Sequence, residues 1–333
     1  MITKYLFNRF LGDYSYHHRL SKALSKPEVY AFETTNICNL RCIMCPYPEM
    51  TRKTGVMSLD LFKKIVDEIK PYSRYISLHN FGEPLMNPEL HRFIEYAAEA
   101  GLKTWLSTNA TLLNEARSLE LLDSRLDVII LSIDGATRET YDKIRQNGQY
   151  EKTKGNIERF LDMKKRKKSR NPLSIVQIIN MINTEDEIAG FKREWQKKAD
   201  KVLVKAFATW SDQVSGIKEL SKEGQRIKPI VEKRHPCLYL WRSLVIQWDG
   251  TIVLCCNDFD NKLVVGDANR QSLLEIWNSS LMRDLRTRHL NGDFGTPICQ
   301  NCREWIGEAR SPLFPLAVTS FRKVKGLFGG GFR

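Results

Sequence analysis

The chain has 333 residues, 42% of them hydrophobic and 27% charged, which is the composition of an ordinary soluble globular protein. This length exceeds one minimal domain, so we expect two domains, and no apolar run approaches the roughly 20 residues that cross a bilayer. The chain has 52 Lys and Arg residues against 39 Asp and Glu residues, which gives a net charge of +13. The excess basic residues either lie on a solvated face or favour an anionic partner. No zinc finger or RNA-recognition motif indicates nucleic acid. Residues 1–10 lack the apolar core of a signal peptide, so we expect a cytoplasmic protein.

Short β-branched or aromatic runs alternate with amphipathic segments from residue 29 to 210, a pattern typical of parallel βα units. Six units are too few for a closed eight-stranded barrel. The sequence therefore predicts an α/β fold with a partial (β/α)6 barrel, whose catalytic groups belong at the carboxyl ends of the strands. The predicted strands are Val29–Thr34, Tyr75–Phe81, Lys103–Ala110, Asp127–Asp134, Leu173–Met181 and Asp200–Trp210.

Helical spacing is clearest in two segments between these strands. The first places Leu59, Phe62, Val66 and Ile69 on one face, after Ser58 as a cap. The second is predicted to begin with Asn87 as cap and Pro88 in its first position, and to stop at Gly101. Further helices are predicted over residues 114–123, 153–168 and 184–198.

The remaining third of the chain predicts a connector followed by a small α+β domain. An Asp249-Gly250 turn between Leu244–Trp248 and Thr251–Cys255 predicts a β-hairpin, and Leu273–Trp277 predicts a helix. The expected organisation is an N-terminal extension (1–28), a barrel (29–210), a connector (211–236), a C-terminal domain (237–306) and a basic tail (307–333).

Eight cysteines in a chain without an export signal favour metal binding or catalysis over disulfides. Cys38, Cys42 and Cys45 directly follow the first predicted strand. Thiolates suit iron–sulfur clusters, and three of them leave one iron of a cubane open to a substrate's amine and carboxylate. The alternative is a tetrahedral zinc site that takes His79 as its fourth ligand.

The C-x3-C-x2-C pattern after a first strand resembles the radical S-adenosylmethionine superfamily. Asn80-Phe81-Gly82-Glu83-Pro84 is similar to the Gly-Gly-Glu-Pro loop of that family, with Phe81 in place of its first glycine. The resemblance implies a [4Fe–4S] cluster on the three cysteines and S-adenosylmethionine as cosubstrate. It also implies that six residues surround the methionine, ribose and carboxylate of the cosubstrate: Gly82, Glu83, Asn109, Ser132, Asp134 and Arg145. Among these, Arg145 is the implied partner of the carboxylate.

The later cysteines resemble the SPASM and twitch extensions of radical enzymes. Cys237, Cys255, Cys299 and Cys302 suffice for one fully ligated auxiliary [4Fe–4S] cluster, the twitch arrangement, although four cysteines ending in C-x2-C also describe a zinc ribbon. Cys256 is then spare. Successive side chains of a strand face opposite ways, so only one of Cys255 and Cys256 can face the cluster, and the spacing from Gly250 favours Cys255.

The resemblance implies cleavage of S-adenosylmethionine to a 5′-deoxyadenosyl radical, which abstracts a hydrogen atom from the substrate. The cysteine layout is similar to that of aminocyclitol dehydrogenases, which implies an oxidoreductase that completes a two-electron oxidation of a small polar, sugar-like or aminocyclitol-like substrate. The expected partners are this small molecule, which can be anionic, and an electron donor such as flavodoxin or ferredoxin. No residue is assigned as general base.

Two alternatives to this oxidoreductase remain. One is modification of a peptide or lipid-linked substrate by the same chemistry, with peripheral membrane contact through basic, aromatic ends such as residues 314–332. The other is a non-catalytic metal-binding scaffold, which would fail to cleave S-adenosylmethionine.

Overall fold

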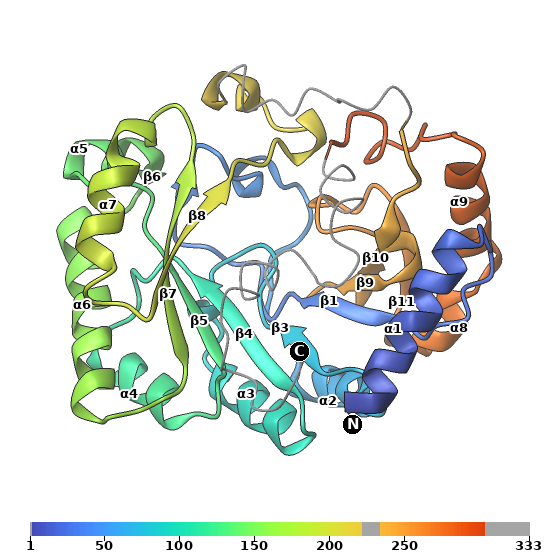
Figure 1. Ribbon diagram of the computed structural model, residues 1–333, viewed down its shortest axis with the longest axis horizontal. Coiled ribbons are helices and arrows are strands. Elements are labelled where there is room, and N and C mark those ends of the chain that lie inside the picture. Colours follow the sequence, from blue (N-terminus) through green and yellow to red (C-terminus); the bar gives the residue numbers. More distant parts are fainter. Residues whose placement is uncertain (1, 222–233, 304–333) are drawn as a thin grey trace, which may run out of the picture.

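A computed structural model describes residues 2–221 and 234–303. Its centre is a parallel sheet in the order β3-β4-β5-β7-β8 (Figure 1). All six predicted strands are present, although most are shorter than predicted, and the first of them, β1 (Glu28–Phe32), lies beside β3. The five strands of the sheet are β3 (Tyr75–Ser77), β4 (Lys103–Thr108), β5 (Val128–Ser132), β7 (Leu173–Asn180) and β8 (Lys201–Ala206). The predicted α/β class with an open barrel is confirmed.

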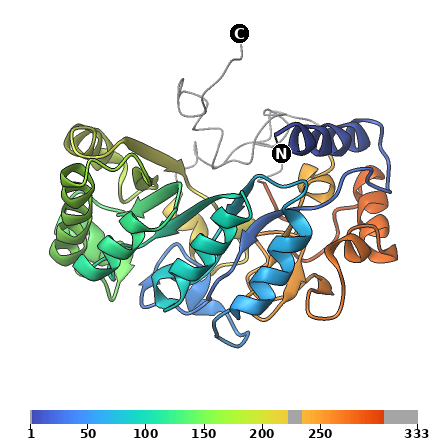
Figure 2. The same ribbon diagram turned by 90° about the horizontal axis from the view of Figure 1, so that it is seen from below.

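Helices cover the outer side of this curved sheet, as Figure 2 shows. They are α2 (Leu59–Ile69), α3 (Leu90–Glu99), α4 (Glu115–Asp123), α5 (Arg138–Ile144), α6 (Tyr150–Arg166) and α7 (Ile188–Trp195). The α2 prediction is confirmed to the residue, because Ser58 accepts a hydrogen bond from the Leu61 amide and caps the helix.

The predicted start of α3, with Asn87 as cap and Pro88 in the first position, is wrong by two residues, because the helix begins at Leu90 after Glu89 as cap. The Asn87 side chain accepts the Glu89 amide at 2.9 Å and donates to the Thr34 carbonyl at 3.2 Å. It therefore ties the segment before the helix to the end of β1 instead of capping the first turn.

A second sheet has the order β1-β9-β10-β11, with β9 (Ser243–Ile246), β10 (Thr251–Val253) and β11 (Val264–Asp267). The predicted hairpin is confirmed by the antiparallel pairing of β9 and β10, with Gly250 at φ +91° in its turn. The parallel pairing of β1 with β9 was not predicted. Hydrogen bonds thus join the predicted barrel to the predicted C-terminal domain, and the domain boundaries stay a prediction.

The other elements complete the described chain. A small bridge pairs β2 (Arg41–Cys42) with β6 (Arg145–Gln146), and the C-terminal part adds α8 (Leu273–Trp277), as predicted, and α9 (Ser280–Leu290). The N-terminal extension forms a helix, α1 (Ile2–His17), that packs on residues 238–241. Single 3₁₀ turns lie at Tyr47–Glu49, Pro84–Met86, Glu185–Glu187, Trp210–Asp212, Ile217–Leu220 and Leu238–Trp241. The predicted basic tail lies outside the described residues.

Candidate iron–sulfur and cosubstrate site

Cys38, Cys42 and Cys45 lie together in the loop that leaves β1. Burial raises the pKa of Cys38 to about 11, and the neighbouring Glu83 and Cys42 add to this rise. Burial also raises the pKa of Cys45 to about 12, and its other neighbours that raise the pKa are Cys42 and Cys38. Cys42 is buried and the other two thiols are half-buried, and three such thiols that disfavour one another's ionised form need a strongly positive group among them to act as thiolates.

The arrangement of these thiols fits an iron–sulfur cluster better than a single metal ion. Within residues 2–221 and 234–303, no three His, Cys, Asp or Glu side chains converge closely enough to hold one metal ion. His79, the fourth ligand of the zinc alternative, uses its Nδ1 to accept the Ser107 amide at 3.1 Å. Thiols that are neighbours without converging on one point suit a cubane, whose corners stand apart.

The loop at residues 80–84 is in close backbone contact with residues 35–37, which precede Cys38. Gly82 has φ +79°, and a Cβ added to it would lie 2.6 Å from the Thr35 carbonyl oxygen. The Glu83 amide donates to the Ile37 carbonyl at 2.8 Å. Only glycine permits this approach of two backbones, so Gly82 sets the position of the first cysteine.

The buried Glu83 carboxylate connects this loop to the end of β4. It accepts the Thr108 hydroxyl at 2.6 Å, the Asn109 amide at 2.7 Å and the Leu85 amide at 3.1 Å. The Asn109 side chain in turn donates to Asn39 at 3.1 Å and lies 4.0 Å from the Cys38 sulfur. Glu83 and Asn109 therefore lie beside the first cysteine, and their contact with the cosubstrate stays a prediction.

Arg145 connects the next strand ends to the cysteine loop. Its Nε donates to Asp134 at 2.9 Å, and its backbone pairs with that of Cys42 between β6 and β2. Burial alone would lower the pKa of this guanidinium, but Asp134 and Cys42 together hold the pKa above its ordinary value. The predicted partner of the cosubstrate carboxylate is thus already paired with another predicted site residue.

Ser132 belongs to a row of polar side chains across the inner face of the barrel. Its hydroxyl lies 3.0 Å from that of Ser107 and accepts the Gln177 side-chain amide at 3.2 Å. No sequence motif specifies Gln177 or Asn39, although Gln177 lies within a predicted strand. A polar residue in an otherwise apolar strand was the available signal.

One exposed lysine, Lys205, lies at the end of β8. Lys205 pairs in register with Ile179, whose amide donates to Asp134 at 2.8 Å. In the part of the chain that the structure describes, Lys205 has no hydrogen bond or ion pair. Desolvation by the surrounding protein lowers its pKa, while Asp134 and then Cys256 act in the opposite direction. Because Asp134 already forms an ion pair with Arg145, the Lys205 ammonium group is available to a bound molecule.

The later cysteines fall into a group of four and one thiol apart, but strand alternation is not the reason, because β10 ends at Val253, before both Cys255 and Cys256. Burial raises the pKa of Cys237 well above its usual range, and Cys255, Cys302 and Cys299 raise it further, so these four thiols are neighbours. Cys256 packs elsewhere, against Ala31, Val245 and Val253. The thiol set Cys237, Cys255, Cys299 and Cys302 therefore forms one group, and Cys256 lies outside it.

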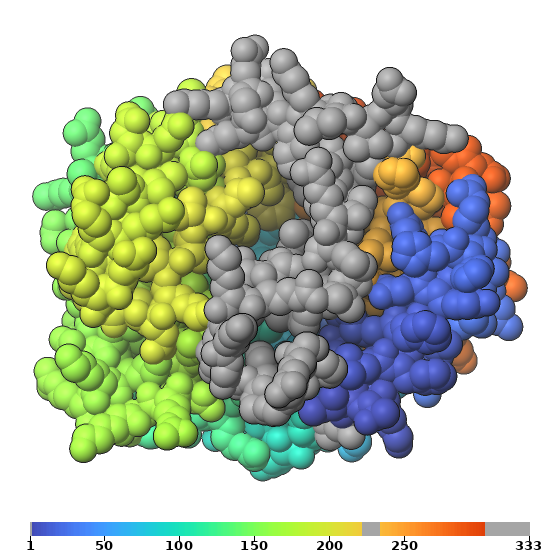
Figure 3. Space-filling model, viewed as in Figure 1, coloured from blue at the N-terminus to red at the C-terminus, as the bar shows by residue number. Residues whose placement is uncertain are grey.

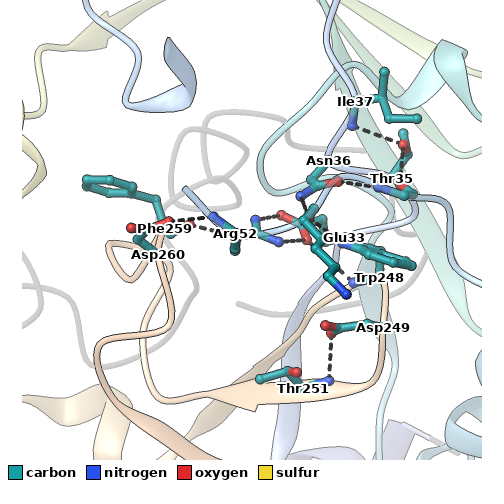
Figure 4. Close-up of polar contacts among 12 residues, drawn as sticks. Glu33, Thr35, Asn36, Ile37, Arg52, Trp248, Asp249, Thr251, Phe259 and Asp260 are labelled. Carbon is teal, nitrogen blue, oxygen red and sulfur yellow. Dashed lines mark hydrogen bonds and ion pairs between the residues drawn. The ribbon is translucent and has the colours of Figure 1, made fainter. Parts of the chain in front are cut away.

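A polar joint connects the two cysteine-bearing regions (Figure 4). The buried carboxylate of Glu33, which directly follows β1, accepts a hydrogen bond from each of the two terminal nitrogens of Arg52. Arg52 also donates its Nε to the Phe259 carbonyl at 2.7 Å, and Asp260 accepts the Arg52 amide at 3.0 Å. Residues 51–52 follow the first cysteine group and residues 259–260 follow Cys255, so this joint fixes one region against the other.

The division of the thiols gives a direct test by paired substitution. Cys255→Ala should lose or weaken the auxiliary cluster, whereas Cys256→Ala should keep the iron content of the wild type, because thiolates hold the iron. Iron analysis of both variants after anaerobic reconstitution measures this. The opposite result would exchange the roles of the two residues.

Comparison with known proteins agrees with this architecture. Residues 32–191 match the Radical SAM superfamily, and residues 237–303 match the SPASM iron–sulfur cluster-binding domain. An AdoMet-dependent heme synthase of Methanosarcina barkeri is 34% identical over 134 residues, which cover 40% of this chain and 38% of that protein. The chain thus spans well under half the length of this relative.

Solved structures share the fold at low sequence identity. BtrN in complex with AdoMet and 2-DOIA is 20% identical, with a TM-score of 0.55 over 83% of this chain and 94% of BtrN. Streptococcus suis SuiB bound to S-adenosylmethionine is 15% identical, with a TM-score of 0.61 over 79% of this chain and 68% of SuiB. The two matched domains bring [4Fe–4S] clusters and S-adenosylmethionine as cofactors. The chain therefore carries a domain of the radical S-adenosylmethionine superfamily over residues 32–191, followed by a SPASM iron–sulfur cluster-binding domain over residues 237–303.

Proposed function

We propose that this radical S-adenosylmethionine enzyme is an oxidoreductase that removes two electrons and two protons from a small polar substrate, sugar-like or aminocyclitol-like. The observation that carries the proposal is the single group of four later thiols, with Cys256 outside it. Four ligands fill every iron of one cubane, so the auxiliary cluster has no iron open to substrate. Electron transfer is the role that such a cluster can fill.

The residues fall into three sets by the group that each would hold. When bound, the first cluster and S-adenosylmethionine supply a 5′-deoxyadenosyl radical, and the auxiliary cluster supplies an electron acceptor. Cys38, Cys42 and Cys45 would hold the first cluster; Gly82, Glu83, Asn109, Ser132, Asp134 and Arg145 would surround the cosubstrate; Cys237, Cys255, Cys299 and Cys302 would hold the auxiliary cluster.

The protein's own part is to position the substrate and exclude water. Lys205 would bind an anionic or strongly polar group of the substrate, because it is exposed and the charges of Cys256 and Cys45, one from each cysteine-bearing region, act on its ammonium group. Burial, and then the charge of Lys205, lowers the pKa of His79 to about 3, so this imidazole stays neutral beside the site. A flavodoxin or ferredoxin is the proposed electron donor.

The first measurement is the product itself. Reconstituted enzyme incubated with S-adenosylmethionine, dithionite and a panel of sugars and aminocyclitols should yield a product lighter by two hydrogens. Cys299→Ala/Cys302→Ala should still cleave S-adenosylmethionine but lower the ratio of oxidised product to 5′-deoxyadenosine, because the substrate radical loses its electron acceptor.

The ratio of oxidised product to 5′-deoxyadenosine reports on the auxiliary cluster only if the variant remains folded and has lost the auxiliary iron. An unchanged ratio would make the auxiliary cluster structural and replace oxidation with a redox-neutral C–H modification. Failure of the wild type to form any 5′-deoxyadenosine would instead favour the non-catalytic scaffold. No helix in the described ranges is long and apolar enough to span a membrane.

A further inference from the structure

The N-terminal helix α1 has the reverse of the usual polarity of a surface helix. Its fully buried residues are polar or small, apart from one tyrosine, and comprise Tyr5, Asn8, Arg9, Gly12 and Ser15; Leu11 and Tyr16 are half-buried beside them. Its outward residues include five large hydrophobic side chains, namely Ile2 (51% exposed), Leu6 (48%), Phe7 (61%), Phe10 (59%) and Tyr14 (42%). An ordinary surface helix turns its apolar stripe toward the core.

Specific contacts hold α1 in this orientation. The Asn8 side chain donates to the Lys26 carbonyl at 3.0 Å and accepts the Lys26 amide at 2.8 Å. Arg9 donates to the Tyr5 hydroxyl at 2.9 Å and lies 3.6 Å from the Glu28 carboxylate. A Cβ at Gly12 would lie 2.9 Å from the Trp241 carbonyl oxygen, so the helix is also in backbone contact on this side. Turning the helix over would break all of these contacts.

The exposed side of α1 forms one continuous apolar stripe. Positions 2, 6, 10 and 14 recur every four residues and so follow one side of the helix, with Phe7 beside them. Phe7, Phe10 and Tyr14 are the aromatic members of the strongly exposed hydrophobic side chains in the described chain, and most of the others are scattered singly over other elements. Figure 2 shows α1 along the edge of the molecule, and Figure 3 shows the dark blue N-terminal residues at the surface. A clustered stripe of this kind marks an interaction surface.

The charges around this stripe favour an anionic surface. Lys4 and Lys22 are exposed. Asp13 is the one acidic residue among residues 1–26, and it accepts a hydrogen bond from Arg242 at 2.7 Å, so it is already engaged. The helix therefore offers phenylalanine, leucine and isoleucine side chains together with free cations and no free carboxylate, the combination that binds the headgroup region of anionic bilayers.

We propose that α1 is a peripheral membrane-binding helix, which lays Leu6, Phe7 and Phe10 into the interface of an anionic lipid bilayer. The protein does not span the bilayer in this arrangement. The apolar stripe would lie at the boundary between headgroups and acyl chains, while the contacts of Asn8 and Arg9 keep the folded protein on the water side. This inference is independent of the proposed oxidation, because it uses none of the site residues.

Vesicle sedimentation of the full-length, cluster-loaded protein tests the proposal. At low ionic strength the wild type should sediment with vesicles of phosphatidylcholine mixed with phosphatidylglycerol, and less with phosphatidylcholine alone. Phe7→Ser/Phe10→Ser should lower the partition coefficient by at least about tenfold, because two exposed aromatic rings are lost. Leu119→Ser/Leu281→Ser, which removes two exposed side chains from α4 and α9, is the matched control and should bind like the wild type.

Three results would overturn the proposal. The wild type could remain in the supernatant with anionic vesicles, or the Phe7→Ser/Phe10→Ser variant could sediment like the wild type. The third result would come from analytical ultracentrifugation: the wild type could be a dimer and the Phe7→Ser/Phe10→Ser variant a monomer, with neither protein binding vesicles. This result would assign the stripe to contact with a second copy of the chain. Unchanged iron content and circular dichroism establish that each variant is folded.

Discussion

Replacing Cys38, Cys42 and Cys45 together with alanine should abolish the formation of 5′-deoxyadenosine and leave about half of the iron. The wild type, with two cubanes, should bind about eight irons after anaerobic reconstitution. The two thiol groups lie in different parts of the chain, and the auxiliary group has its own four members. The triple variant should therefore keep about four irons, yet have no cluster beside the cosubstrate.

The control for this experiment is Cys256→Ala, which removes a thiol outside both groups. It should retain the full iron content and the full rate of 5′-deoxyadenosine formation. Iron analysis and chromatography of the reduced reaction mixture give both quantities for each protein. Continued formation of 5′-deoxyadenosine by the triple variant would show that the first cluster is wrongly assigned.

The barrel was predictable because its elements are specified locally. Alternating apolar runs located all six strands, and Ser58 marked the start of α2 because its hydroxyl accepts a backbone amide three residues later. The start of α3 was missed because Asn87 is used in a contact with Thr34, which is distant in sequence. The helix α1 was missed because its apolar stripe faces outward and its inward face is polar, so periodicity alone carries little information about it.

The pairing of β1 with β9 could not be predicted, since it joins segments more than two hundred residues apart and each strand alone is compatible with several neighbours. The cysteines were predictable from spacing. The partners of Glu83 and Arg145 were not, because Thr108, Asn109 and Asp134 meet them only after three strands are aligned. Sequence motifs thus placed residues at the correct strand ends and left open which of those residues hold one another.

Arg52→Met should lower the free energy of unfolding by about 3–5 kcal/mol, the usual cost of leaving a buried charge without its partner. The Glu33 side chain is 0% exposed and that of Arg52 is 8% exposed, so water cannot replace the lost guanidinium. The Trp248 amide, at 3.4 Å, is the other donor to the Glu33 carboxylate among the described contacts. Urea unfolding of the cluster-loaded protein, followed by tryptophan fluorescence, measures the difference.

Arg138→Met is the matched control, because Arg138 pairs with Asp142 at 3.4 Å while its own side chain is 76% exposed. Loss of such a surface pair should cost less than about 1 kcal/mol. The double variant Glu33→Gln/Arg52→Met should be more stable than Arg52→Met alone, because it removes the unpaired charge and not only its partner. If Arg52→Met proved as mild as Arg138→Met, the joint between residues 51–52 and 259–260 would not depend on this ion pair, and Asp260 with the backbone contacts would have to hold the two cysteine-bearing regions together.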